Sequence, residues 1–254
     1  MIDDRRIRQL EAKIDAFRTR EKDSDARKTY DQVFDRAALL NLAKLISDGA
    51  ISTLDYPVST GKEANIFHAT DPTGGAKAVK IYRIATSTFR NISRYIEGDS
   101  RFQGVKRSTR PTILAWAQKE HKNLLRMANA GVRVPHPAAL LANILVMEYV
   151  GDESRPARTL KEVRLEDPAA VYADVVANMK AIRRAELVHA DLSEYNLLLW
   201  EGRVVVIDVG QAVPLDHSRA AEWFRRDVEN IARYFRRLRI DTSADELEHE
   251  VRGE

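Results

Sequence analysis

The segment of this sequence best suited to chemistry is 189–210, where three polar side chains stand among apolar neighbours. Asp191 is followed five residues later by Asn196, and Asp208 follows a second apolar run. The apolar runs flank residues 201–202, Glu-Gly, which predict a tight β-hairpin. Such a hairpin brings Asn196 and Asp208 together at its open end. Their oxygen atoms suit Mg²⁺, which binds one or two protein oxygens together with substrate phosphates. The segment therefore predicts phosphoryl transfer.

Composition limits the class of protein. A chain of 254 residues can hold one large domain or two lobes, and 44% apolar with 31% charged residues is typical of a soluble globular protein. The sequence has no cysteine, which excludes disulfides and thiolate metal sites. It shows no apolar run long enough for a membrane span and no secretory signal, so we expect a cytoplasmic protein without a membrane partner.

Positive charge is concentrated in one segment. The net charge is only +3, but residues 83–111 hold seven basic residues against Glu97 and Asp99. This segment is either a solvated loop or a surface for an anionic partner, and the sequence leaves both open.

The first part of the chain is predicted to be helical. Residues 1–22 are dense in charge of both signs. Residues 26–48 show helical spacing that stops at Gly49, with Tyr30, Val33, Phe34 and Ala37 on the packed face. We expect residues 1–48 to form a helical extension.

The period changes after residue 50. Strands are predicted at 63–71 and 76–82, and Lys80 shares one face of the second strand with Ala78 and Tyr82. A helix over 113–129 carries Glu120 in its stripe of Leu114, Ala117, Leu124 and Ala128. A carboxylate there is costly unless a cation meets it, and Lys80 is the candidate. The alternatives are a surface lysine on an edge strand and a glutamate that reaches water.

The second half of the chain is predicted to be mainly helical. The apolar run 139–150 reads as strands that end in a connector, and the polar stretch 152–156 marks a lobe boundary. Asp167-Pro168 begins a helix, because an N-cap residue followed by proline is a start signal. A last helix after Asp216 has an apolar stripe and an arginine-rich face, which is typical of a solvated face. The buried positions predicted for these two helices are Tyr172, Val175, Val176, Met179 and Ile182 in the first, and Phe224, Val228, Ile231, Phe235 and Leu238 in the second.

The order of these features is that of the protein-kinase signature set. Phosphoryl transfer depends on positioning and charge neutralisation. Lys80 would hold the α- and β-phosphates of ATP and be oriented by Glu120. Asn196 and Asp208 would hold the metal, and Asp191 would accept or orient the attacking hydroxyl.

Three motifs also resemble one family, the RIO family of atypical serine/threonine protein kinases. They are Ser59–Phe67, His189–Asn196 and Ile207–Gln211, and their residues resemble those of the first, RIO-one type subgroup. The resemblance implies an α+β, trimmed bilobal kinase-like fold: a twisted antiparallel sheet plus one helix in the N-lobe (49–150), and a mainly helical C-lobe (151–254). It implies ATP with Mg²⁺ or Mn²⁺, serine autophosphorylation, and a transient phosphate on Asp208 that makes the protein partly an ATPase.

The resemblance also implies partners and further site residues. The partner would be the pre-small ribosomal subunit with its rRNA, and no DNA is expected. The residues expected to bind ATP are Ser59, Lys62, Lys80, Glu120, Met147, Glu148 and Val150. Candidate acceptors for autophosphorylation are Ser108 and Thr109, together with Thr86, Ser87, Thr88 and Ser93.

The sequence departs from ordinary protein kinases. The loop expected at 59–65 has one glycine, Ala190 replaces the usual arginine, and Ser193 stands where a catalytic lysine is usual. Only 44 residues follow Gly210, so we expect no peptide-docking subdomain.

Two alternatives stay open at this stage. One is a small-molecule kinase of the aminoglycoside or choline type, which shares His-x-Asp-x₄-Asn but usually has a longer helical domain after it. The other is a non-catalytic ribosome assembly factor in which ATP only fixes a conformation.

Overall fold

The computed structural model describes residues 8, 10–12, 34–84, 92, 95–96, 98–102, 104–106, 108–153 and 155–253. Most of the helix predicted for 1–22 and much of the basic segment lie outside these residues, as do Tyr30, Val33, Thr86, Ser87, Thr88 and Ser93. The chain divides into two compact units: Met1–Arg94, Gly104–Gln118 and Pro137–Tyr149 form the first, and Tyr95–Gln103, Lys119–His136 and Val150–Glu254 the second. The three-part division predicted at residues 48 and 150 stays a prediction.

Helix α3 (Arg36–Ser47) belongs to the core of the first unit. It begins at Arg36 because the carboxylate of Asp35 accepts a hydrogen bond from the N–H of Ala38 at 2.7 Å. Its end before Gly49, which has φ +78°, confirms the predicted stop. Phe34 is buried as expected, but Ala37 is only half-buried. The buried face of the helix is instead Ala38, Leu39, Leu42, Ala43 and Leu45.

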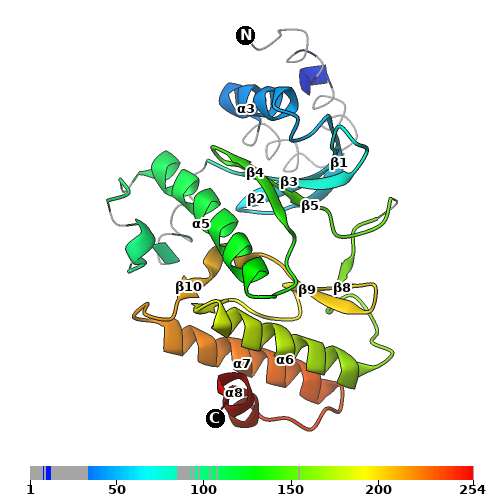
Figure 1. Cartoon of the computed structure of the whole chain (residues 1–254), viewed down its shortest axis with the longest axis vertical. Helices are drawn as coiled ribbons and strands as arrows, with labels where there is room; N and C mark the ends of the chain where they lie inside the picture. The colour runs from blue at the N-terminus through cyan, green and yellow to red at the C-terminus, as the bar shows by residue number, and fades with distance from the viewer. Residues whose placement is uncertain are drawn as a thin grey trace. The chain divides into compact units, whose positions relative to one another are not determined.

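A five-stranded antiparallel sheet also belongs to the first unit (Figure 1). Its order is β1-β2-β3-β5-β4, so β3 is the central strand. The strands are β1 (Thr53–Thr60), β2 (Ala64–Thr70), β3 (Ala76–Tyr82), β4 (Pro137–Leu141) and β5 (Ile144–Glu148). Val79 and Ile81 share the core with Leu42 of α3. Because side chains alternate along a strand, Lys80 lies on the opposite face.

The loop predicted at 59–65 is shorter than expected. Ser59 ends β1 together with Thr60, and Asn65 already belongs to β2, so only residues 61–63 form the turn. Gly61 donates its N–H to the carbonyl of Ala64 at 3.0 Å. The sequence reading missed β1 because Pro57 and two register shifts interrupt its alternation.

Helix α5 (Thr109–Asn129) begins four residues before the predicted start at 113. The reason is Pro111, which lies in the first turn. There a missing N–H removes no hydrogen bond, because the first N–H groups of a helix have no partner within it. Ala117 and Leu124 are buried as predicted, but Leu114 and Ala128 are only half-buried.

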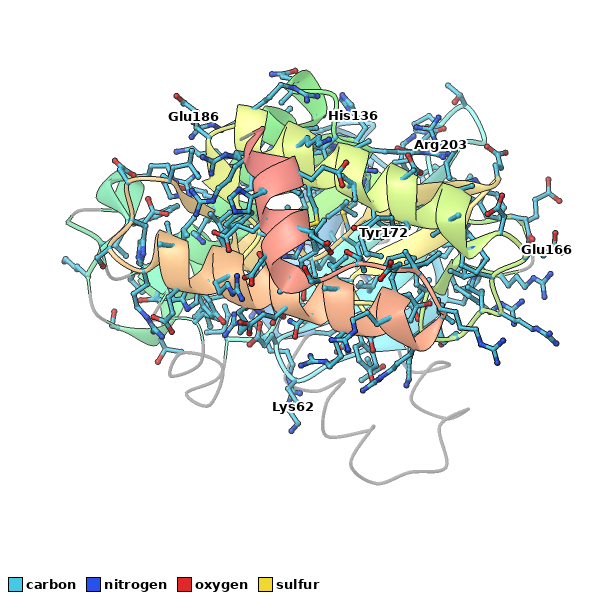
Figure 2. The ribbon with its side chains drawn as sticks, turned by 90° about the horizontal axis from the view of Figure 1, so that it is seen from below. Lys62, His136, Glu166, Tyr172, Glu186 and Arg203 are labelled. Carbon is cyan, nitrogen blue, oxygen red and sulfur yellow. The ribbon has the colours of Figure 1, made fainter. Side chains whose placement is uncertain are left out.

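Three helices dominate the second unit: α6 (Pro168–Arg184), α7 (Ala220–Arg237) and α8 (Ala244–Arg252). Helices α6 and α7 run side by side and α8 lies across both (Figure 2). The predicted start of α6 is confirmed, since Asp167 accepts hydrogen bonds from the N–H groups of Ala169 and Ala170. Tyr172 is only half-buried, and its hydroxyl lies 2.8 Å from that of Thr242. The predicted stripe of α7 is buried except Leu238, which caps the helix and is half-buried.

The predicted hairpin is confirmed in the same unit. Strand β8 (Leu197–Trp200) pairs with β9 (Arg203–Val206), and the N–H of Ile207 donates to the carbonyl of Asn196 at 3.0 Å. Both turn residues, Glu201 and Gly202, have positive φ, as this kind of turn requires. Short strands β6 (Arg158–Thr159), β7 (Leu187–Val188) and β10 (Val213–Pro214) and the 3₁₀ turns η1 (Ser100–Phe102) and η2 (Val209–Gln211) complete the described elements.

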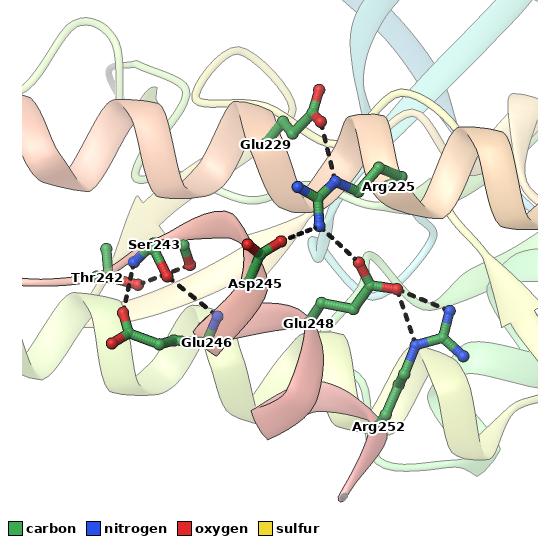
Figure 3. A network of polar contacts seen from close by, with 8 residues as sticks. All are labelled: Arg225, Glu229, Thr242, Ser243, Asp245, Glu246, Glu248 and Arg252. Carbon is green, nitrogen blue, oxygen red and sulfur yellow. Dashed lines mark hydrogen bonds and ion pairs between the residues drawn. The ribbon is translucent and has the colours of Figure 1, made fainter.

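The arginine-rich face of α7 is partly used inside the protein. Arg225 pairs with Glu229 on its own helix and with Asp245 and Glu248 on α8 (Figure 3). Arg233, Arg236, Arg237 and Arg239 are exposed. Among the described residues, no helix is both long and apolar enough to cross a membrane.

Candidate active site

Helix α7 fixes the backbone of the segment around Asp191 through a buried carboxylate. Asp227 is 2% exposed, and its two oxygens accept hydrogen bonds from the N–H groups of Ala190 and Leu192, each at 2.8 Å. Ala190 has φ +67°, a conformation that costs a non-glycine residue of the order of 1 kcal/mol and persists only where surrounding contacts impose it. Asp227 supplies those contacts.

Two further side chains of α7 hold the same segment. Arg226 donates to the carbonyl of Ala190, and Asn230 donates to the carbonyl of Leu192 at 3.1 Å. The N–H and C=O groups on both sides of Asp191 are therefore bonded to one helix. Burial raises the pKa of Asp227 to about 7, and the two backbone hydrogen bonds partly oppose that rise.

Asp191 and Asn196, which the sequence predicts to act together, lie in contact. The amide nitrogen of Asn196 donates to the backbone carbonyl of Asp191 at 2.8 Å and lies 3.4 Å from its carboxylate. The amide of Gln211 donates to the same carboxylate at 3.1 Å. Gln211 was part of a motif that the sequence reading quoted but received no role there.

The donor set fits a magnesium ion. Because the Asn196 nitrogen is used on Asp191, its amide oxygen is left to face another group, and no described residue donates to it. Asp208 has φ +56° and makes no capping hydrogen bond to η2. No cluster of three His, Cys, Asp or Glu side chains that could hold a metal occurs among the described residues. One amide and one carboxylate oxygen suit Mg²⁺, which completes its shell with phosphate oxygens and water.

His189 links the two ends of the site. Its Nε2 lies 3.1 Å from the carbonyl of Ile207, so Nε2 carries the proton that is donated. Nδ1 is buried and has no partner among the described residues. Burial lowers the pKa of His189 to about 4, against the opposing effects of the Ile207 hydrogen bond and the Asp208 charge. The ring is therefore neutral at pH 7.

Helix α5 holds the segment that follows Asp208. Lys119 donates to the carbonyl of Gly210 at 2.8 Å, and the amide nitrogen of Asn123 donates to the carbonyls of Val209 and Ala212 at 2.8 and 3.0 Å. Both side chains are 0% exposed, and burial holds the pKa of Lys119 well below its usual range. Side chains of one helix thus donate hydrogen bonds to three backbone carbonyls of the segment 209–212.

A second tier of contacts holds Asn123. Its amide oxygen accepts a hydrogen bond from Arg101 at 2.8 Å, and Arg101 pairs with the buried carboxylate of Asp99 at 2.7 Å. The 98–102 segment therefore reaches the chain after Asp208 through Arg101 and Asn123. The sequence reading counted Arg101 and Asp99 only as charges of the basic segment.

The first unit carries five of the seven residues predicted to bind ATP: Ser59, Lys62, Lys80, Met147 and Glu148. Lys80 lies at the middle of the central strand, opposite Ile66 of β2 and Leu145 of β5, and is 8% exposed. Its Nζ lies 5.3 Å from the ring centre of Tyr82. These positions contradict the reading of Lys80 as a surface lysine on an edge strand.

The remaining predicted residues of this unit lie on β5 and at the turn between β1 and β2. Met147 is buried opposite Ala78, on the Lys80 face, while Glu148 next to it is exposed. Ser59 and Lys62 are exposed at the β1–β2 turn, and Figure 2 shows the Lys62 side chain pointing away from the ribbon.

Four other predicted residues are placed as follows. Glu120 is 2% exposed, which excludes the reading in which it reaches water; its pairing with Lys80 stays a prediction. Val150 begins a narrow hairpin and accepts the N–H of Ala157 at 2.9 Å. Gly151 is required there, because a Cβ would lie 2.6 Å from the carbonyl oxygen of Arg155. Ser108 is exposed before α5 and Thr109 is its first residue; their role as phosphate acceptors stays a prediction.

Comparison with known proteins identifies the family. The sequence model of the RIO domain, RIO1, matches residues 65–248. The chain is also 46% identical over 251 residues to the RIO-type serine/threonine-protein kinase Rio1 of Haloferax volcanii, covering 99% of this chain and 87% of that protein. The chain belongs to the RIO family.

Other relatives agree with this assignment. The human serine/threonine-protein kinase RIO1 is 38% identical over 221 residues, which cover 85% of this chain and 39% of the human protein. The chain thus spans less than half of that eukaryotic relative. The relatives named RIO1 in archaea and eukaryotes place the chain in the RIO1 subgroup of atypical serine/threonine protein kinases. They give no support to the small-molecule kinase alternative.

Solved structures confirm the predicted α+β kinase-like fold. The Rio2 kinase from Chaetomium thermophilum has a TM-score of 0.68 and 27% identity, covering 84% of this chain and 66% of that one. The Rio2 kinase-ADP/Mg²⁺-phosphoaspartate complex from the same organism has a TM-score of 0.65 and 25% identity, covering 84% and 65%.

Asp227→Ala is expected to lower the free energy of unfolding by about 2–6 kcal/mol, because two buried N–H groups lose their acceptor at about 1–3 kcal/mol each. Asp227→Asn keeps one accepting oxygen and should cost less. Urea denaturation of the three proteins measures the difference. Equal stability of Asp227→Ala and wild type would contradict the role given to this carboxylate.

His189 is expected to make the protein sensitive to acid. An unfolded histidine titrates near pH 6.5 and the folded one near 4, so its contribution is fully present above pH 6.5 and is lost as pH falls towards 4. The loss amounts to about 3 kcal/mol at ~1.4 kcal/mol per pKa unit. His189→Gln keeps an N–H near the Nε2 position and does not titrate. Denaturation at pH 7, 5.5 and 4.5 should show a shallower decline for the variant; parallel declines would refute the assignment.

Asn123→Leu is expected to lower the free energy of unfolding by about 2–4 kcal/mol, because two buried carbonyls and Arg101 lose a partner. Gln118→Leu makes a comparable change at an exposed position of the same helix. Surface substitutions of this kind usually stay within about 0.5 kcal/mol. Thermal and urea unfolding of both variants provide the test, and a similar effect at the two positions would count against the contact.

Proposed function

We propose that this RIO kinase binds ATP with Mg²⁺ or Mn²⁺ and transfers the γ-phosphate in an autophosphorylation and ATP-hydrolysis cycle. The observation that carries the proposal is the rigid mounting of Asp191, Asn196 and Asp208. Helix α7 bonds the backbone on both sides of Asp191, and α5 bonds the carbonyls after Asp208. Phosphoryl transfer depends on such positioning more than on covalent work by the protein.

The proposed roles are those that the order of the motifs and the family resemblance imply. Asn196 and Asp208 hold the metal, which neutralises charge on the phosphates when it is bound. Lys80, on the face of the sheet opposite Val79 and Ile81, holds the α- and β-phosphates and is oriented by Glu120. The backbone around Glu148 and Val150 receives the adenine, and Ser59 and Lys62 cover the phosphates. The side chains of Lys80 and Glu120 are both buried, and a charge in the protein interior is costly unless a partner of opposite sign meets it.

The transfer step uses Asp191 as proton acceptor. A hydroxyl oxygen forms a bond to the γ-phosphorus, the bond from that phosphorus to the oxygen of the β-phosphate breaks, and ADP leaves. The hydroxyl proton passes to the Asp191 carboxylate, which Gln211 and Asn196 hold in position. With the Asp208 carboxylate as nucleophile, the same displacement needs no proton transfer and yields an acyl phosphate. The Rio2 kinase-ADP/Mg²⁺-phosphoaspartate complex from Chaetomium thermophilum supports this second course.

We propose the pre-small ribosomal subunit, including its rRNA, as the partner. This rests on the family resemblance. The exposed arginines at the end of α7 support an anionic partner, although Arg225 and Arg226 are engaged within the protein.

Asp208→Ala and Asp191→Ala are each expected to reduce autophosphorylation at least 100-fold, because the first removes a metal ligand and the second the proton acceptor. Labelled ATP with Mg²⁺ or Mn²⁺ measures protein-bound and released phosphate. Asp216→Ala, an exposed aspartate outside the site, is the matched control. Phosphopeptide mapping of the product shows whether Ser108 or Thr109 is the acceptor.

The outcomes separate the competing functions. Turnover by wild type that both variants lose supports the proposal. Absence of turnover with every metal, combined with rRNA binding that persists in Asp191→Ala, would favour the non-catalytic assembly factor.

A further inference from the structure

A basic hollow of about 410 Å³ lies where helices α6 and α8 end in the second unit. Four cations and one carboxylate line it, together with two small or apolar residues: Lys180, Arg183, Arg184, Arg252, Glu250, Val251 and Gly253. The hollow therefore concentrates an excess of three positive charges, as much as the formal net charge of +3 of the whole chain. Such a concentration of charge in a recess attracts anions.

The charges of two arginines in this hollow are not neutralised within the described residues. Lys180 pairs with Glu250 at 3.0 Å and Arg252 pairs with Glu248 at 2.8 Å. Arg184 donates only to the carbonyl of Ala130, at 3.4 Å. No described carboxylate lies within ion-pair distance of Arg183 or Arg184. An entering anion would therefore gain two cations without displacing an internal partner.

An aromatic ring fixes two of the guanidinium groups in advance. The guanidinium carbons of Arg183 and Arg252 lie 5.8 and 5.2 Å from the ring centre of Phe224, a buried residue of α7. Contact with an aromatic face restricts the guanidinium group, so less entropy is lost when it binds a ligand. Arg252 already bonds Glu248 through Nε and Nη2, so the guanidinium group of Arg183 supplies the N–H donors that are not used on a carboxylate, and guanidinium N–H groups suit phosphate oxygens.

Helix-end stabilisation explains only part of this cluster. Basic residues in the last turn of a helix interact favourably with its C-terminal dipole, and α6 and α8 both end here. One cation per helix is enough for that effect. It accounts neither for the two guanidinium groups at one ring nor for the recess between the helix ends.

We propose that this hollow is an anion site that binds a phosphate group, either free or as part of a phosphodiester. Arg183 and Arg184 provide the charge that is not neutralised within the protein, and Arg252 provides a guanidinium group held by Phe224. Arg183 and Phe224 also line a small cavity with His189 and Asp227, so a ligand in the hollow contacts a side chain that packs behind the Asp191 segment. The site is separate from the proposed nucleotide site and does not depend on it.

The test measures binding of tripolyphosphate by calorimetry, in the presence of saturating ADP and Mg²⁺ so that the proposed nucleotide site is occupied. The double variant R183Q/R184Q is expected to bind at least tenfold more weakly than wild type. Arg158→Gln with Arg164→Gln removes the same charge from two exposed arginines outside the hollow and should change binding less than twofold. Because Arg183 contacts Phe224, the single change Arg184→Gln at the exposed position is a second variant whose folding is not at risk; we expect a loss of about threefold.

A second arm distinguishes the sources of phosphate. Fluorescence anisotropy with a labelled 12-nucleotide single-stranded RNA is run on the same variants at 50 and 200 mM salt. RNA binding that R183Q/R184Q weakens, with the control unchanged, supports the site and assigns it to a phosphodiester. RNA binding that no variant changes, with tripolyphosphate lost, supports it for free phosphate. No tripolyphosphate binding by wild type, or equal losses in the double variant and its control, would overturn the proposal.

Discussion

The geometry of the active-site segment depends on one buried carboxylate, that of Asp227. An aspartate in an apolar helix stripe is unfavourable by itself, since burial alone shifts its pKa upwards by several units. It is tolerated because two backbone N–H groups need the acceptor that it provides. Those N–H groups are left without strand or helix partners by the left-handed conformation at Ala190. The carboxylate supplies the acceptor that the two N–H groups lack, and the N–H groups supply the donors that the buried carboxylate needs.

Helix α5 solves the opposite problem for the chain after Asp208. There the groups without strand partners are carbonyls, and Lys119 and Asn123 supply buried donors. The two helices thus provide complementary chemistry: an acceptor from α7 for N–H groups and donors from α5 for C=O groups. In both places a polar side chain in a helix interior stabilises an irregular segment that carries the functional groups, because buried backbone polar groups must be paired. These hydrogen bonds explain how the candidate site residues can lie on segments that are neither helix nor strand.

Periodicity and turn chemistry predicted the regular parts of this fold well. The β8–β9 hairpin followed from Glu201-Gly202, the start of α6 from Asp167-Pro168, and the end of α3 from Gly49. The first strand was missed because Pro57 breaks its pattern. The start of α5 was predicted four residues too late, because the apolar stripe begins only after Pro111, which lies in the first turn. Asn196 was predicted to lie beside Asp208, and that pairing stays a prediction; the contact that the structure shows for Asn196 is with Asp191.

The supporting residues were harder to find. Asp227, Lys119 and Asn123 are single polar residues in helices and belong to no motif. Their role depends on which backbone groups lie opposite them in the fold, and no local sequence pattern predicts that. A usable signal did exist, since Asp227 interrupts the apolar stripe of α7 between Phe224 and Ile231, in the way that led to Glu120 being noticed in α5.

The Glu201-Gly202 turn determines which insertions this hairpin can accept. Strand pairing places Asn196 opposite Ile207, the residue before Asp208, so the number of residues in the hairpin is not what aligns this end. An insertion that adds one residue to each strand at the tip lengthens the ribbon away from Asn196 and Asp208 and preserves every pair below it. A single added residue reverses the faces of one strand and exposes its apolar side chains. The tip is therefore a natural position for a reporter peptide or for variation among relatives in steps of two.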